Sequence, residues 1–457
     1  MAALLSQTFR ARWRAWLPAL GVVILVSTLV GVSVLHFWTT TTPQMADAVE
    51  QAGTTLAEVR IAAQTVYVLT ALFGAIALNV VGAATVQAER TLMAQWRLAG
   101  AVPRQTAGMA IGLVGLTALA GSIPGAILAA LIGPPMVSLL NTMAGPDIAS
   151  VPVTMHLAPA AVTILLTIGT CLLGAVSPAR RAGRVPAIEA LVATSPRPVR
   201  LTAWRWVLTV IGAITTGVIA VAALTVPATS NGMVTIALYL GLCLILTFHV
   251  AAPGLVPAII RGFGRLLAVV DSPALQIARR SAVARSRISS ATVAPLAAGL
   301  GCVGILVGTL NTFLARMRTF GVTEANVADT WIIVTVAAVM LTACSVAVVA
   351  LTSRNREREF ALLRVAGATP TTLGRVVLLE AMLYVVTALI LAAVATLATT
   401  MTLAWLGYQA GLPFTAQFPG VTLAAFGAGA YIAIAIATAL PAKKAIGANL
   451  RSSLSPE

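Results

Sequence analysis

The amino-acid sequence predicts an all-α polytopic membrane protein with ten transmembrane helices, on the evidence of its composition and its apolar runs. Hydrophobic residues make up 59% of the 457 residues, charged residues make up only 9%, and the mean hydropathy is +0.96. A soluble domain usually has about 25% charged residues, so this composition is that of a chain that folds in a bilayer. The net charge of +16 does not indicate nucleic-acid binding, because the basic residues lie in short loops rather than on one basic face.

Ten apolar runs reach the length of about 20 residues that a helix needs to cross the hydrocarbon layer. If the N-terminus is cytoplasmic, 26 of the 29 basic residues lie on the cytoplasmic side, and only Arg60, Arg316 and Arg318 lie outside. Both termini are therefore expected in the cytoplasm. The first run is long and lacks a small-residue cleavage site, so we expect a retained span and not a signal peptide. The runs are residues 15–37, 62–85, 106–133, 157–177, 204–226, 232–258, 288–312, 329–352, 373–406 and 419–440.

Two loops between these runs have nearly the same sequence. Trp96-Arg-Leu-Ala-Gly-Ala-Val-Pro103 returns 267 residues later as Leu363-Arg-Val-Ala-Gly-Ala-Thr-Pro370. Two other pairs of landmarks recur in the same order. The first span follows Ala11-Arg-Trp-Arg14 and the seventh follows Ala284-Arg-Ser-Arg287, while the fourth and tenth end in Pro178-Ala-Arg-Arg-Ala182 and Pro441-Ala-Lys-Lys-Ala445. The chain is therefore predicted to contain an internal duplication.

The duplication predicts three parts. Residues 1–194 form a first four-span repeat, residues 195–262 form a linker and a central pair of spans, and residues 263–457 form a second four-span repeat. Both repeats start from the same side of the membrane, so they are parallel and a pseudo-two-fold axis along the membrane normal is expected to relate them.

With these motifs, the chain resembles the FtsX-like permeases of bacterial ABC transporters. The pattern is an apolar span, an Arg/Glu-rich stretch, a Leu-Leu-Arg-x-x-Gly-Ala segment, another span, and a last span that ends in Pro-Ala-[Arg/Lys]-[Arg/Lys]-Ala. The ten-span layout with a central pair is similar to bacitracin-exporter-type permeases. However, residues 313–328 are too few for the large extracellular domain of that group, and residues 38–61 leave no room for the folded domain of macrolide-exporter-like members.

Each repeated loop is predicted to form a short amphipathic helix. In the second copy, Arg356 and Glu359 can pair on one face, while Phe360 and Leu363 share a neighbouring apolar face. Gly367 is expected to end the helix and Pro370 to begin the next one. The first copy follows the same plan, with Leu92 at the position of Glu359. A helix on the membrane surface, with arginines that contact anionic lipid, is the alternative.

The resemblance implies that such helices dock on an ATPase subunit. The residues expected to carry this coupling are Arg90, Trp96, Arg97, Gly100, Pro103, Arg356, Glu359, Phe360, Arg364, Gly367 and Pro370. A P-loop needs a lysine after a glycine-rich turn, and the only lysines are Lys443 and Lys444, after an apolar span. We therefore expect no enzymatic activity in this chain. ATP and Mg²⁺ should be held by a separate ABC ATPase, in two copies for the two helices.

Few polar side chains are expected inside the membrane. Glu380 is the only acid well inside a span, with Leu113 at the matching position of the first repeat, and a structural role with an interfacial partner such as Arg375 is favoured. His249 is expected to be a satisfied buried histidine, and Asn79 either bonds between helices or contacts substrate. No metal site is predicted. The four cysteines, Cys171, Cys243, Cys302 and Cys344, are expected to be free thiols. Two glycine pairs, Gly121/Gly125 and Gly304/Gly308, are expected to allow close helix packing.

The segments outside the membrane carry apolar residues at helical spacing. They are predicted to be short helical extensions of the spans, which either line an outer gate for an amphiphile or pack against each other. Val49, Leu56 and Asn79 in the first half, and Phe313, Met317 and Phe320 in the second, are the candidate substrate or gate residues. The other members of the first pattern are Met45, Ala52 and Val59.

These observations favour the permease subunit of an ABC transporter in a bacterial cytoplasmic membrane, which exports or extracts an amphipathic peptide, lipid or drug. The expected partners are the ATPase, membrane lipid and an accessory extracytoplasmic protein. The alternative is a non-transporting regulator or sensor that couples an ATPase to an extracytoplasmic partner. Such regulators need an outer domain, and the largest outer segments expected here have only about 25 residues. An ion-coupled secondary transporter is disfavoured, because it normally places several acids at mid-membrane.

Overall fold

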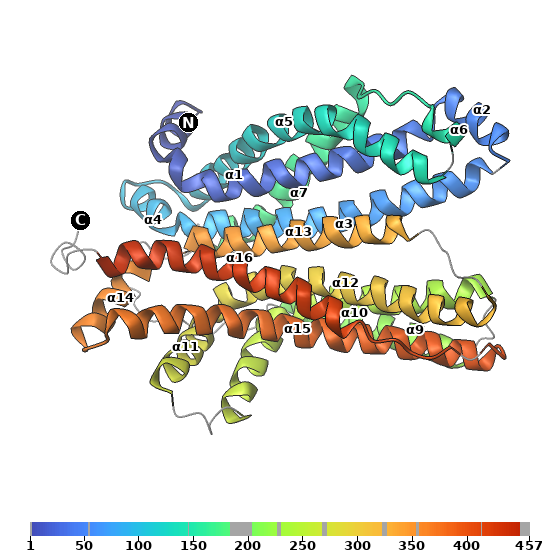
Figure 1. Cartoon of the computed structure of the whole chain (residues 1–457). Helices are drawn as coiled ribbons and strands as arrows, with labels where there is room; N and C mark the ends of the chain where they lie inside the picture. Colours follow the sequence, from blue (N-terminus) through green and yellow to red (C-terminus); the bar gives the residue numbers. More distant parts are fainter. Residues whose placement is uncertain are drawn as a thin grey trace. The chain divides into compact units, whose positions relative to one another are not determined.

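The computed structural model is built of α-helices (Figure 1), and the residues that it describes contain no strand. It describes residues 2–53, 55–144, 146–182, 203–225, 230–266, 272–321, 327–352, 356–412 and 414–447. The helices are α1 (Ala2–Thr39), α2 (Pro43–Gln51), α3 (Leu56–Ala88), α4 (Arg90–Leu98), α5 (Pro103–Ala144), α6 (Pro146–Ala149), α7 (Leu157–Ala182), α9 (Ala203–Thr225), α10 (Ser230–Leu266), α11 (Pro273–Ala284), α12 (Ser286–Thr319), α13 (Ala328–Thr352), α14 (Arg356–Val365), α15 (Pro370–Gln409) and α16 (Gly420–Gly447).

Each of the ten predicted spans falls on one long apolar helix, which confirms the predicted membrane-protein class. The longest of these apolar segments, Pro103–Thr142 and Pro370–Gln409, each contain 40 residues and exceed the predicted runs. A helix of 40 residues is about 60 Å long, twice the thickness of the hydrocarbon layer. In α5 the helix passes through Pro134 and Pro135. A proline removes only its own backbone donor, and neighbouring helices can support the rest of the backbone.

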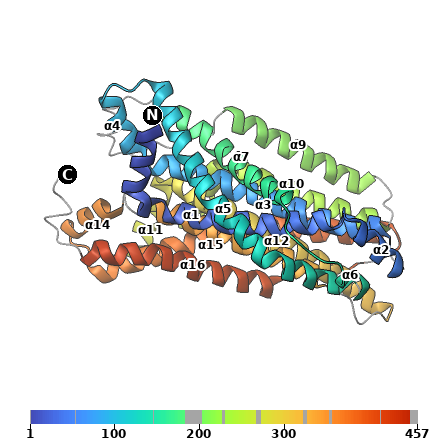
Figure 2. The same ribbon diagram turned by 90° about the horizontal axis from the view of Figure 1, so that it is seen from above.

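The described helices form two compact units. The first contains α1 to α7 and also α13, and the second contains α9 to α12 and α14 to α16. In the first unit, α1 packs on α5 and α3, and α7 packs on α3 and α5. Figure 2 shows α1, α3, α5 and α7 side by side in this unit. In the second, α12 and α15 form the central pair, with α10 against both and α16 against α15.

The helix α13 joins the first unit through α3. The Cys344 thiol of α13 donates a hydrogen bond to the carbonyl oxygen of Ala77 in α3, at 3.4 Å. These residues are 267 positions apart, which is also the separation of the two loop motifs. The two helices therefore meet at matching positions of the predicted repeats, whose relation by a two-fold axis stays a prediction. The boundaries of the repeats remain a prediction, since the units group helices by contact and not by sequence relationship.

Small residues allow close helix packing in both units, as the predicted glycine pairs suggest. In the first unit, a Cβ atom on Gly121 or Gly125 would lie 2.6 Å from Val23 or Ser27 of α1. In the second, a Cβ atom on Gly304 would overlap the Thr396 hydroxyl of α15. Lipid tails are as apolar as leucine, so helices associate by this kind of close fit rather than by apolar burial.

The two helices α12 and α9 differ most in their surroundings. In the most apolar stretch of α12, 89% of the residues are buried, whereas in α9 only 6% are buried. The helix α12 is therefore the core of the second unit, and α9 is a peripheral helix that packs mainly on α10 and leaves most of its apolar side chains exposed. Any change in α12 must be transmitted to its neighbours, because a packed interior has no space to absorb it.

We predict that Gly304→Val separates α12 from α15, because the added side chain has no room beside Thr396. Overpacking of this kind usually costs about 1–3 kcal/mol, so the unfolding temperature of the detergent-solubilised protein should fall by several degrees. Gly429→Val in α16 is the matched control, since a Cβ atom there meets nothing within 4 Å. Equal unfolding temperatures for the two variants would contradict the packing argument.

Candidate functional site

The repeated loops fold as predicted into two short helices with the same ends. Gly100 after α4 and Gly367 after α14 both have a φ of +93°, a left-handed conformation that favours glycine. In each copy the backbone N–H of the next alanine bonds five residues back, from Ala101 to Trp96 at 3.0 Å and from Ala368 to Leu363 at 2.9 Å. This pattern is the Schellman motif, which satisfies carbonyl oxygens at a helix C-terminus.

The next long helix begins directly after each glycine turn. Pro103 is the first residue of α5 and Pro370 is the first residue of α15. The Thr369 hydroxyl accepts a hydrogen bond from the backbone N–H of Thr372 at 3.3 Å, so it caps α15. In the first copy, the Gln105 amide oxygen accepts from the N–H of Val102 at 3.1 Å. Each loop helix is thus joined to a span through a rigid, hydrogen-bonded turn.

One large apolar residue of each loop helix is buried. Met93 and Phe360 occupy matching positions, and they are only 3% and 4% exposed. Phe360 packs in a cluster with Leu373 and Val377 of α15 and Ala442 of α16. Phe360 is among the residues predicted to couple the helix to the ATPase. In this structure it anchors α14 to its own unit, and its part in coupling stays a prediction.

A different apolar pair points outward. Leu98 and Val365, which also match in the two copies, are 57% and 65% exposed. Leu362 of α14 is exposed as well. Sequence reasoning missed these residues, although their place directly after Arg97 and Arg364 in both motifs was a usable signal. Each loop helix therefore has a buried anchor and an exposed apolar tip.

The charged and aromatic residues of the prediction surround these tips. Trp96, Arg97 and Arg364 are half-buried, whereas Arg90 is exposed at the start of α4. Arg356 and Glu359 belong to α14, but their side chains lie outside the part of the chain that the structure describes, so their predicted pairing stays a prediction. Within each unit, the loop helix lies at one end, and in the first unit α2 and α6 lie at the opposite end (Figure 1).

The candidate gate residues lie at the ends of the units opposite the loop helices. They make packing contacts with neighbouring residues, as expected if they do not line a gate. Val49 is buried in a cluster with Met45, Ala48, Ile148 and Val151, and Leu56 packs against it. In the second unit, Phe313 stacks on Phe414 with ring centroids 6.5 Å apart, while the Arg316 guanidinium lies over the Phe320 ring at 4.5 Å. Met317 is half-buried. These residues hold the ends of each unit together.

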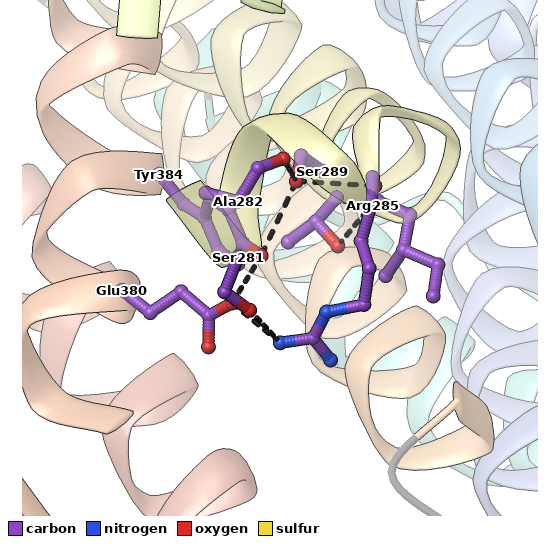
Figure 3. Close-up of polar contacts among 8 residues, drawn as sticks. Ser281, Ala282, Arg285, Ser289, Glu380 and Tyr384 are labelled. Atoms are coloured by element: carbon purple, nitrogen blue, oxygen red, sulfur yellow. Dashed lines mark hydrogen bonds and ion pairs between the residues drawn. The ribbon is translucent and has the colours of Figure 1, made fainter. Parts of the chain in front are cut away.

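Glu380 has a different partner from the expected one. Arg375 is exposed, and the carboxylate of Glu380 instead pairs with Arg285, whose Nη2 lies 2.7 Å from Oε1 (Figure 3). The structural role of Glu380 was therefore anticipated, but its partner was wrong. A glutamate can reach an arginine 95 residues away only through the packing of α11 and α12 on α15, for which the local sequence carries no signal.

The remaining polar residues do not form a common site among the described residues. Asn79 has an exposed side chain, while its backbone packs closely against Gly174 of α7. His249 lies in α10, where its ring makes a hydrogen bond with the backbone of Ala294, while its buried Nδ1 has no hydrogen-bond partner in the described part of the chain. The expected satisfied histidine is thus observed only in part. The four cysteines are free thiols. No group of three metal-binding side chains occurs in the ranges described.

We predict that Leu98→Cys and Val365→Cys react readily with a membrane-impermeant maleimide, whereas Met93→Cys and Phe360→Cys react slowly. The first pair is exposed and the second pair is buried, and reaction requires access of the reagent to the thiolate. The four native cysteines would be replaced by alanine first. Labelling measured on inside-out and right-side-out vesicles also reports which side of the membrane carries α4 and α14, and equal rates for all four variants would contradict the inward and outward assignments.

Comparison with known proteins places these features in a family. The model of the FtsX-like permease C-terminal domain matches the chain twice, at residues 64–187 and 331–450, and each match includes one loop helix. No curated protein matches the sequence significantly. Members of this family are permease-type membrane subunits that generally work with an ABC ATPase and are generally not enzymes themselves. Because the two matched regions cover more than half of its length, this multi-pass membrane chain belongs to the FtsX-like permease family.

Proposed function

We propose that the chain is the permease of an ATP-driven transporter in a bacterial cytoplasmic membrane, and that α4 and α14 each dock on one copy of a separate ATPase. The observation that carries this proposal is the shared geometry of the two helices. Each has a buried anchor, an exposed apolar tip and a glycine at φ +93° before a long span. A membrane-surface helix would need no such rigid connection to the next span.

The exposed tips are suited to a groove on a protein partner. An isolated apolar side chain in water gains free energy when a partner covers it, at roughly 25 cal/mol per Å². Arg97 and Arg364 directly precede Leu98 and Val365 in the sequence, so they add positive charge beside these apolar side chains. A charge of one sign steers the approach of a partner surface of the opposite sign. The ATPase copies would hold ATP and Mg²⁺.

The proposed motion starts when the two ATPase copies close on ATP. Each docked helix moves with its ATPase, and the rigid glycine turn passes the displacement to α5 or α15. Both spans extend well beyond the hydrocarbon thickness, so their far ends move outside the membrane. We propose an amphipathic peptide, lipid or drug as the substrate, taken from the lipid that faces the exposed apolar helices.

A non-transporting regulator or sensor is the second candidate. It rests on the same docking helices, and it differs in that the far ends of the units would act on an extracytoplasmic partner rather than on a substrate. The clusters at Val49 and at Phe313 favour it in one respect, because their residues already pack against neighbouring side chains. Recovery of an extracytoplasmic protein with the complex, and no substrate-stimulated ATP hydrolysis, would select this alternative.

We predict that Leu98→Asp and Val365→Asp each weaken ATPase binding by about tenfold or more, because each buries a charge where an apolar contact is expected. The chain would be expressed with its genomic neighbours, purified in mild detergent and weighed as an intact complex. The wild type should carry two ATPase copies, each single variant one copy and the double variant none. Leu157→Asp, at an exposed leucine that begins α7, is the control. Two copies retained by the double variant would rule out docking at these tips.

We also predict that Gly100→Val with Gly367→Val uncouples ATP hydrolysis from the spans. A β-branched residue at φ +93° costs about 1–2 kcal/mol per position, so the turn between each helix and its span should loosen while the exposed tips stay intact. The double variant should still bind the ATPase but lose most of the substrate-stimulated hydrolysis. Gly108→Val, at a glycine of α5 with ordinary φ and open space around it, should behave like the wild type. Full stimulation in the double variant would contradict the rigid connection.

A further inference from the structure

The second unit contains a buried polar cluster of Ser281, Arg285, Ser289, Glu380 and Tyr384 (Figure 3). It joins three helices, because Ser281 belongs to α11, Ser289 to α12, and both Glu380 and Tyr384 to α15. Arg285 is the single residue between α11 and α12, with φ −94° and ψ 36°. The cluster therefore lies where the chain turns from a short helix into the core helix of the unit.

Three donors converge on one oxygen atom of Glu380. Arg285 Nη2 is 2.7 Å from Oε1, Ser281 Oγ is 3.2 Å away and the Tyr384 hydroxyl is 3.3 Å away. The Glu380 side chain is only 2% exposed and that of Arg285 is 13% exposed. A buried carboxylate that loses its cation is left as an uncompensated charge, which strongly disfavours separation of the helices.

Further hydrogen bonds hold the cluster on both sides of Arg285, in α11 and in α12. Arg285 Nη2 also donates to Ser281 Oγ at 2.6 Å, and the Ser289 hydroxyl donates to the carbonyl of Ala282 at 2.7 Å. Ser289 Oγ also lies 3.3 Å from the Tyr384 hydroxyl. The junction between α11 and α12 is thereby fixed within itself and to α15.

The loop helix α14 leads directly to this cluster. Its anchor Phe360 packs on Leu373 and Val377 of α15, and Glu380 follows Val377 by three residues, about one helical turn. The helix α11 packs on Val376 and Leu383, on the two sides of Glu380. A displacement of α14 therefore reaches α15 first and the α11–α12 junction next.

The first repeat lacks this cluster at the matching positions. Leu113 replaces Glu380 and is buried, and Thr117 replaces Tyr384, where its hydroxyl donates to the carbonyl oxygen of Leu113 at 2.9 Å. Arg12 matches Arg285 in the sequence motif that precedes the first span. No carboxylate is available in α5 at this level, so the first unit cannot form the same ion pair.

We propose that Glu380 and Arg285 are positioning residues that make α11, α12 and α15 move as one body with α14, and we call this ion pair the clamp. At the matching position of α5, the first repeat has Leu113 instead of an acid. The inference rests on the proposed function, in which an ATPase displaces α4 and α14. The ATPase copy that docks on α14 then drives α12, the core helix of its unit, through the clamp, whereas the copy that docks on α4 acts on a unit whose α5 carries no acid at this level.

Hydrogen exchange of the full chain in nanodiscs, with and without the co-purified ATPase, tests the clamp. In the chain alone, Glu380→Gln should raise exchange in α11 and the first turns of α12 by about tenfold or more, because the amide keeps a hydrogen-bonding group but not the charge. In the complex, ATP should change exchange in both α14 and α12 of the wild type. In the Glu380→Gln variant the change should remain in α14 and be lost in α12.

The controls separate a positional role from simple loss of stability. Arg375→Gln removes an exposed charge from the same helix and should leave both responses unchanged. The exchanged pair Arg285→Glu with Glu380→Arg should restore at least part of the α12 response. Unchanged exchange of α11 and α12 in Glu380→Gln, or an ATP response of α12 that survives in it, would overturn the inference. If no ATPase co-purifies, the proposed function fails, while exchange in the chain alone still supports or overturns the clamp.

Discussion

The lipid interior offers no hydrogen-bond partner to a backbone and no hydrophobic gain for contact between helices, and the structure depends on how the chain meets this double constraint. All spans are helices, and they associate where small residues allow close contact. In the second unit Gly304 and Gly308 of α12 face Thr396 and Thr400 of α15. This contact places α15, and α15 in turn places α14 through Phe360. The position of a loop helix is thus decided by glycines more than 50 residues earlier in the chain.

Hydropathy predicted the ten spans because it measures the one property that insertion requires, a sufficiently long apolar segment. It did not predict that α5 continues as a helix to Ala144, well beyond the predicted run of residues 106–133, because helix length depends on backbone hydrogen bonds and tertiary support, not on membrane thickness. Nor could it predict that α13 packs on α3, as the contact from Cys344 to Ala77 shows. The order of spans in a sequence carries little information on which helices become neighbours.

The loop helices show the same division between local and tertiary information. Gly100, Gly367, Pro103 and Pro370 were predictable as helix ends because their backbone preferences act within a few residues. The orientation of α14 was not, because it has apolar residues on two sides, and only the packed structure shows that Phe360 is buried while Val365 is exposed. Likewise, a lone acid inside a span, such as Glu380, predicts a polar partner nearby. The identity of that partner depends on the packing of the three helices that meet at Arg285.

The length of α15 has a mechanical consequence. From Pro370 to Gln409 it has no internal proline, whereas α5 carries Pro124, Pro134 and Pro135 in its second half. A straight rod of about 60 Å that tilts by about 10° swings its far end by about 10 Å. The continuous helix would convert a small displacement at one end into a larger displacement at the other. In α5, the prolines are positions at which the helix can bend, so it would transmit less of the displacement. The unit that contains α15 would therefore transmit a displacement over a longer distance, whereas the unit that contains α5 would bend.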